Sequence, residues 1–159
     1  MTPSSEPGRT ATARRGTPAT GSDAGAGASR YHQVRTEEDL LTARHEVRSA
    51  TLDVGFGLVD QTRVVTAASE LVRNAYIHGG GGTLEITPLN QAGRRGLRLT
   101  VTDEGPGIAD VEAALRDGYS TGVGMGHGLG GARRLMHEFE LDTGIGRGTT
   151  VVVTRWTTP

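Results

Sequence analysis

Residues 97–107 read L-R-L-T-V-T-D-E-G-P-G, an alternating apolar pattern that ends in acidic residues and glycines. Because the side chains of a strand alternate between its two faces, the apolar residues at 97, 99 and 101 share a face with Asp103. A carboxylate on a buried face is costly unless it has a polar partner. The sequence therefore predicts that Asp103 meets such a partner, for example the exocyclic amine of a heterocycle. The alternative is a turn aspartate that caps Gly-Pro-Gly.

Glycines mark two places where the backbone is expected to approach a ligand. Gly105 and Gly107 permit positive φ angles and a close backbone approach directly after the predicted strand. Farther along, the segment 118–131 holds seven glycines in 14 residues and leads into an apolar helix pattern. Backbone N–H groups beside a helix N-terminus bind anions, so this loop predicts a phosphate site. A flexible linker is the alternative interpretation of the loop.

The same loop matches the dinucleotide-binding pattern GxGxxG at Gly126, Gly128 and Gly131. That fingerprint requires an apolar strand immediately upstream, and the preceding residues D-G-Y-S-T-G-V-G-M are not a strand. The match therefore follows from glycine density alone. The five histidines show no metal-ligand spacing, and of these only His127, inside the loop, is placed to touch a ligand.

Glu70 and Asn74 lie four residues apart in a helix pattern that starts with Asp60 as its N-cap and runs to about His78. Residues at this spacing share one helix face, and this face is turned away from the apolar stripe of the helix. A carboxylate and an amide oxygen together suit a hard cation such as Mg²⁺, or a base beside a metal ligand. A solvated helix face is the alternative.

The other apolar patterns predict an α+β domain. Strands joined by hairpins form a mixed, mainly antiparallel sheet with helices on one face, which is a two-layer sandwich. The first helix has Thr36 as its N-cap, an apolar side of Leu40, Leu41, Val47 and Ala50, and Gly55 and Gly57 at its end. The other expected elements are a strand at 31–35, a helix at 60–78, strands at 83–88 and 97–103, a helix at 129–139 and a hairpin of 140–143 with 149–156.

The first 29 residues differ in composition from the rest of the chain. Residues 1–29 contain no Val, Ile, Leu, Phe, Tyr or Trp, so they cannot bury enough apolar surface to fold and are predicted to be disordered. Residues 30–159 form the expected folded domain. No apolar segment follows Met1 as in a signal peptide, and no stretch approaches 18 apolar residues, so we expect a cytoplasmic protein without a membrane span.

The charged residues exclude several classes of function. All 17 basic residues are arginines, and with 18 acidic residues the net charge is −1. This balance provides no basic field for nucleic acid or an acidic membrane. The absence of lysine excludes a Walker A loop and a eukaryotic-type protein kinase, since both place a lysine on the phosphates. The absence of cysteine excludes disulfides and a thiol nucleophile.

Four motifs stand in a fixed order: E-L-V-R-N at 70–74, D-E-G-P-G at 103–107, the glycine-rich loop at 122–131 and G-T at 148–149. Together they resemble the GHKL, or Bergerat-fold, ATPase superfamily over residues 30–159. The stretches D-G-Y-S-T-G, G-F-G-L-V-D-Q-T-R and the final Arg-Trp look like the RsbT-type switch kinases, which are relatives of the anti-sigma-factor serine kinases. Gly130 departs from the proline that switch kinases often have there.

The resemblance implies ATP and Mg²⁺ as ligands and assigns roles to the residues above. Asp103 would accept a hydrogen bond from the adenine amino group, with support from Thr149. Asn74 would hold Mg²⁺, and Glu70 would orient or deprotonate the nucleophile. The resemblance further implies that Gly105 and Gly107 shape the adenine pocket, that Gly124, Gly126 and Gly128 wrap the phosphates, and that Arg133 or Arg134 adds positive charge.

The resemblance also implies a function and partners. The expected function is that of a serine/threonine kinase that phosphorylates a STAS-domain antagonist protein and then binds a PP2C-type phosphatase; a homodimer is also compatible with it. One alternative is an anti-sigma factor that sequesters a sigma factor and uses ATP mainly for conformation. Another is a partner-binding protein whose nucleotide pocket is vestigial.

Overall fold

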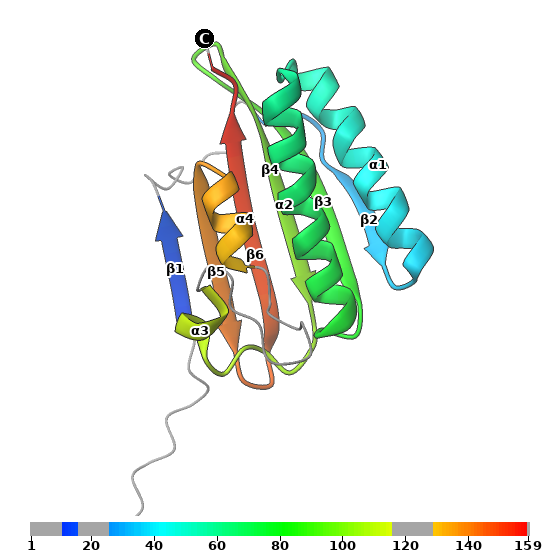
Figure 1. Cartoon of the computed structure of the whole chain (residues 1–159), viewed down its shortest axis with the longest axis vertical. Coiled ribbons are helices and arrows are strands. Elements are labelled where there is room, and N and C mark those ends of the chain that lie inside the picture. The colour runs from blue at the N-terminus through cyan, green and yellow to red at the C-terminus, as the bar shows by residue number, and fades with distance from the viewer. Residues whose placement is uncertain (1–10, 16–25, 116–128, 159) are drawn as a thin grey trace, which may run out of the picture.

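The computed structural model describes residues 11–15, 26–115 and 129–158. One sheet carries all the helices on one face, which confirms the predicted two-layer α+β sandwich (Figure 1). The elements in chain order are β1 (Ala11–Arg15), β2 (Arg30–Val34), α1 (Glu37–Val54), α2 (Leu58–Ile77), β3 (Gly82–Gln91), β4 (Arg94–Asp103), α3 (Val111–Leu115), α4 (Leu129–Leu135), β5 (Glu138–Gly144) and β6 (Gly148–Trp156).

The sheet has the strand order β1-β5-β6-β4-β3-β2. Every pairing among the described strands is antiparallel, so the sheet is more regular than the predicted mixed one. The long central strands β4 and β6 pair over their whole common length. Their register sets Asp103 opposite Thr149, which brings together two residues far apart in the sequence.

The core lies between the sheet and the helices. The predicted stripe of α2 is buried, as are the three apolar residues of β4 that precede Asp103. In α1 the buried stripe is Ala43, Val47, Ala50 and Val54, at the spacing of one helix face. Leu41 lies off that face and is exposed, so its predicted place in the core is wrong. Among the described helices, none combines the length and the apolar character of a membrane span.

The predicted helix ends hold for α1 but not for α2. Thr36 caps α1, since its Oγ1 accepts from the Asp39 N–H at 3.1 Å and the Asp39 carboxylate accepts from the Thr36 N–H at 3.1 Å. Gly55 ends the helix with a φ of 95°. The N-cap of α2, however, is Gly57 rather than Asp60. Asp60 lies within the first turn, where its carboxylate binds arginine side chains instead of backbone N–H groups.

The third predicted helix is shorter than expected. α4 ends at Leu135, and Phe139 is a fully buried residue of β5 rather than a helical one. The chain leaves the helix because the His137 N–H donates to the carbonyl of Thr154 at 2.9 Å and begins the pairing of β5 with β6. The short helix α3 had no clear pattern in the sequence.

Strand β1 lies inside the segment whose composition predicts disorder. Ala11–Arg15 pairs with residues 139–143 of β5 and extends the sheet by one strand. A strand ladder is made of backbone hydrogen bonds, so it forms without the apolar side chains that a packed core needs. The prediction of disorder is therefore wrong for Ala11–Arg15.

A buried ion pair joins α2, α4 and β6. Asp60 Oδ1 lies 2.9 Å from Nη2 of Arg155 and also 2.9 Å from Nη1 of Arg63. The Arg155 side chain is only 11% exposed, whereas that of Arg63 is 46% exposed. Arg155 Nη1 also donates to the Leu135 carbonyl at the end of α4, at 2.8 Å. One guanidinium group thus connects three elements of the fold.

We expect Arg155→Ala to lower the free energy of unfolding by about 3 kcal/mol, because it removes a buried charge partner and leaves a carbonyl without its donor. Arg63→Ala removes an exposed partner of the same carboxylate oxygen and should cost less than about 1 kcal/mol. Urea unfolding followed by circular dichroism measures both losses. Equal losses in the two variants would contradict the structural role of Arg155.

Candidate functional site

A pocket of about 130 Å³ opens where α2 and β4 end and β6 begins, at the lower end of the view in Figure 1. An engineered protein cavity of about 150 Å³ holds benzene, so this pocket has the size for one aromatic ring system. Its walls come from three segments of the chain, at 74–79, 103–108 and 149. The lining residues are Asn74, His78, Gly79, Asp103, Pro106, Gly107, Ile108 and Thr149.

The Asp103 carboxylate is half-buried in the wall of this pocket. Burial raises the pKa of Asp103, while the backbone N–H groups of Gly105 and Thr149 and the charge of His78 act to lower it. The Gly105 N–H donates to Asp103 Oδ1 at 2.9 Å. Since a carboxylate has about four acceptor positions, the bonds from Gly105 and Thr149 leave about half of its capacity for a ligand donor.

The glycines around Asp103 create the space that its side chain occupies. A Cβ atom on Gly79 would lie 2.6 Å from Asp103 Cβ and 2.7 Å from its Oδ1, and one on Gly105 would lie 2.6 Å from Gly79 Cα. Gly107 has a φ of 80°, and a Cβ there would overlap the Gly144 carbonyl. The close approach expected for Gly105 and Gly107 is therefore an approach to other protein backbone. This close packing of backbone holds the Asp103 side chain in place.

A pair of threonines forms the adjacent wall. Thr149 Oγ1 lies 2.9 Å from Thr143 Oγ1, which also accepts from the Ile108 N–H at 2.9 Å and donates to the Gly148 carbonyl at 3.1 Å. Either hydroxyl of this pair can be the donor. When Thr143 donates to the Gly148 carbonyl, Thr149 donates to Thr143. The lone pairs of the Thr149 hydroxyl are then left to accept from a ligand.

The last turns of α2 provide the wall opposite β6. Asn74 and His78, one helical turn apart, both line the pocket. Glu70 lies one turn before Asn74 and is half-buried, but it is not a lining residue. His78 is not among the residues that the sequence predicts to touch a ligand, although its spacing of one helical turn from Asn74 is a usable signal. His127, the histidine it favoured, falls outside the described residues.

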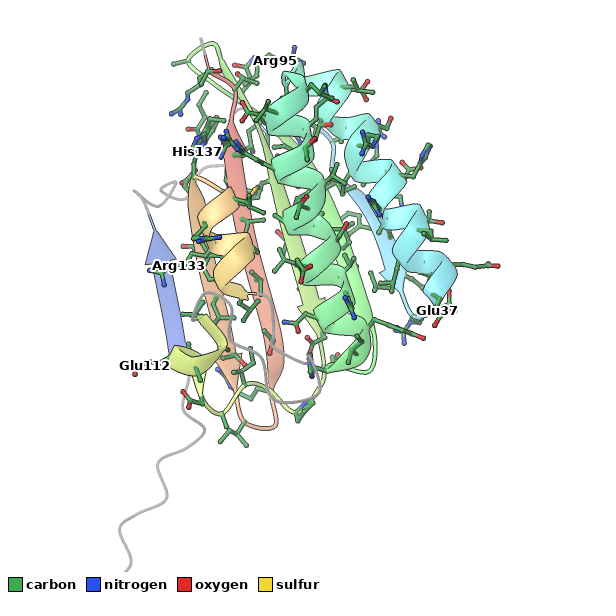
Figure 2. All side chains as sticks on the ribbon, in the orientation of Figure 1. Glu37, Arg95, Glu112, Arg133 and His137 are labelled. Atoms are coloured by element: carbon green, nitrogen blue, oxygen red, sulfur yellow. The ribbon has the colours of Figure 1, made fainter. Side chains whose placement is uncertain are left out.

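Other predicted residues either lie outside the described part of the chain or do not line this pocket. Gly124, Gly126 and Gly128 fall outside the described residues. Arg133 and Arg134 lie on α4, where Figure 2 labels Arg133, and neither lines the pocket. Within 11–15, 26–115 and 129–158, no three His, Cys, Asp or Glu side chains gather as a metal site.

Sequence reasoning also missed several residues of the site. Pro106 is part of D-E-G-P-G but was given no role, Ile108 directly follows this motif, and Gly79 opens the G-G-G-G run after α2. Thr143 had no sequence signal, because only the pairing of β5 with β6 brings it beside Thr149.

Comparisons with known proteins agree with the resemblance that the motifs indicated. Residues 33–156 match the family described as histidine kinase-like ATPase domain. The serine/threonine-protein kinase RsbT of Bacillus subtilis is 42% identical over 124 residues, which cover 78% of this chain and 93% of that protein. The anti-sigma F factor of Geobacillus kaustophilus is 33% identical over 125 residues, covering 74% of this chain and 84% of that protein.

A solved structure has the same fold. The RsbU and RsbW domains of a Mycobacterium tuberculosis protein match 84% of this chain with a TM-score of 0.57 and 23% sequence identity. The match spans 34% of that longer chain. At this level of identity the likeness supports the arrangement of strands and helices and nothing finer.

We expect Gly79→Ala to weaken ATP binding about thirtyfold, because the added methyl group displaces the Asp103 carboxylate and a charge-assisted hydrogen bond is worth about 2 kcal/mol. Gly57→Ala, before the other end of α2, is the matched control, since a Cβ there meets nothing within 4 Å. Calorimetric titration with ATP measures both affinities. Unchanged affinity in Gly79→Ala would show that Asp103 does not depend on this glycine.

The raised pKa of Asp103 predicts a pH-dependent stability. The folded protein favours the protonated carboxyl group, so this contribution is complete below the unfolded pKa of about 3.9 and is lost as pH rises through the higher folded pKa. Asp103→Asn removes the titration. The wild type should therefore lose stability relative to Asp103→Asn as the pH rises above about 3.9. Thermal unfolding across this range tests the trend, and a constant difference would contradict it.

Proposed function

The chain belongs to the histidine kinase-like ATPase domain family, and on that premise we propose that it is an ATP- and Mg²⁺-dependent serine/threonine-protein kinase. The family implies ATP binding. The observation that carries the assignment to this pocket is the half-buried Asp103 carboxylate, with acceptor capacity turned to a cavity of ring size. The 42% identity to a serine/threonine-protein kinase supports the choice of a kinase.

Adenine fits the chemistry of the pocket walls. Asp103 would accept a hydrogen bond from the exocyclic amino group, and the Thr149 hydroxyl would support the same edge of the ring directly or through water. Ile108 contributes apolar surface to the lining. Gly79 and Gly105 keep the carboxylate in place by excluding side chains from behind it. The base would be recognised by one acidic and one hydroxyl group.

The donor set also fits a magnesium ion held between protein and nucleotide. Mg²⁺ keeps several waters and is bound through few protein ligands plus substrate phosphates. Asn74 offers one amide oxygen at the pocket, in keeping with the absence of a three-ligand cluster among the described residues. When bound, the ion would neutralise charge on the phosphates. Gly124, Gly126 and Gly128 would add backbone N–H groups to the same phosphates.

Glu70 is the proposed catalytic residue. It lies on the Asn74 side of α2, one turn farther from the adenine pocket, where the γ-phosphate and the acceptor would meet. Its carboxylate would orient the hydroxyl of a serine or threonine and accept its proton. The hydroxyl oxygen then forms the new bond to the γ-phosphorus, the bond to the bridging oxygen breaks, and ADP leaves. Arg133 or Arg134 would add positive charge on the side of α4.

The proposed substrate is a STAS-domain antagonist protein, and the proposed later partner is a PP2C-type phosphatase. The likeness to RsbT supports this choice. A second candidate function is that of an anti-sigma factor, which the likeness to anti-sigma F factors favours. A stable complex with a sigma factor, and none with a STAS-domain protein, would place the second function first.

We expect Glu70→Ala to bind ATP as wild type does but to transfer phosphate at least about a hundredfold more slowly, because a general base contributes that factor or more. Intact-mass analysis of a STAS-domain protein after incubation with ATP and Mg²⁺ measures the transfer. Thr66→Ala is the control, since this exposed residue lies one turn before Glu70 on the same helix. Transfer by Glu70→Ala at the wild-type rate would remove Glu70 from the chemistry.

A further inference from the structure

The segment 55–63, G-F-G-L-V-D-Q-T-R, forms the turn between α1 and α2 (55–57) and the first residues of α2 (58–63), and it has no part in the nucleotide pocket. Its backbone is fixed by several contacts. Gly55 adopts a left-handed conformation, and its N–H donates to the Thr51 carbonyl at 3.1 Å. Phe56 is buried in the core, and its carbonyl accepts from Gln61 Nε2 at 2.8 Å. The turn is therefore a rigid platform.

Three large apolar side chains on or next to this turn are exposed to solvent. Leu58 is 73% exposed, Val59 is 64% exposed and Leu52, in the last turn of α1, is 60% exposed. Single exposed apolar residues are common, but a group of them on a fixed backbone is typical of a protein contact. We name these three residues the α1–α2 patch; the turn between α1 and α2 lies at the upper end of the view in Figure 1.

Arginines surround the α1–α2 patch. Arg48 precedes Leu52 by one helical turn, and Arg63 follows Val59 by one turn. Arg95 Nη2 donates to the Asp53 carbonyl at 2.8 Å, so its guanidinium lies at the end of α1, where Figure 2 labels it. Arg63 also pairs with Asp60, and the exposed Asp53 adjoins Leu52, so these arginines outnumber the carboxylates beside the patch only slightly. A surface with an excess of carboxylates would be complementary to this positive excess.

We propose that the α1–α2 patch is the docking surface for the protein substrate, which contacts it with an apolar face rimmed by carboxylates. This inference rests on the proposed kinase function. Along α2, Leu58 lies roughly 24 Å from Asn74 at 1.5 Å per residue. A domain of about 100 residues has a radius of gyration of about 13 Å, so one small protein spans both places.

A docking contact this far from the pocket adds affinity for the protein substrate but does not contact the reacting atoms. Its loss should therefore raise the KM for the protein substrate and leave kcat at saturation unchanged. The KM for ATP should also stay the same, because the pocket lies at the other end of α2. Replacing a residue that only stabilises the fold would not raise the KM for the protein substrate while leaving kcat and the KM for ATP unchanged.

The test compares Val59→Asp with Leu41→Asp as a matched control. Leu41 is 70% exposed on α1 but lies outside the patch. Phosphorylation of a STAS-domain protein by each variant gives kcat and both KM values. We expect Val59→Asp to raise the KM for the protein at least about tenfold, as for a residue at the centre of an interface. Leu41→Asp should change it less than about twofold.

Equal KM values for wild type and Val59→Asp, or an equal rise in Leu41→Asp, would overturn the docking proposal and leave the kinase intact. Calorimetric titration of the same proteins decides the case in which wild type transfers no phosphate. Binding that only Val59→Asp loses would then support docking, and no binding to wild type would overturn it. If Val59→Asp changes the oligomeric mass of the protein in solution but not its KM, the patch is a contact with a second copy, which contradicts the proposal.

Discussion

The antiparallel pairing of β4 with β6 is the constraint on which the candidate site depends. It places Asp103 opposite Thr149 at one end of the two central strands, each of which has a neighbouring strand on either side. The end of α2 then closes over this point, and Gly79 meets the Asp103 side chain with no room for a Cβ. A shift of register by one residue would turn Asp103 to the other face of the sheet and remove the carboxylate from the pocket.

The helix α2 gives the molecule two ends with different chemistry. Its C-terminal turns carry Asn74 and His78 at the pocket, and its first turn presents Leu58 and Val59 to solvent. Asp60, between these two regions, uses its carboxylate to hold β6 through Arg155 instead of capping the helix. A rigid helix of this length fixes the distance between the site of transfer and the proposed docking surface. The proposed kinase thus separates recognition of its substrate from chemistry.

Local patterns predicted the elements well where one face of an element is buried. The stripe of α2 and the alternation in β4 follow from burial on a single side, and both are present. Predictions failed where a distant group competes for the same atoms. Asp60 binds Arg155 instead of capping α2. Helix α4 ends at Leu135 because the chain then begins to pair as β5 with β6. Strand β1 forms in a segment without large apolar side chains because its partner supplies the backbone ladder.

By itself, the sequence determined the sandwich class, the helix face that carries Glu70 and Asn74, and the buried side of β4 that ends in Asp103. These properties follow from periodicities of 3.6 and 2 residues, which are local. Only the tertiary structure decided that Gly79 and Gly105 pack against Asp103 and that Thr143 supports Thr149. Such contacts depend on which segments the sheet brings together, and no spacing within one segment encodes them.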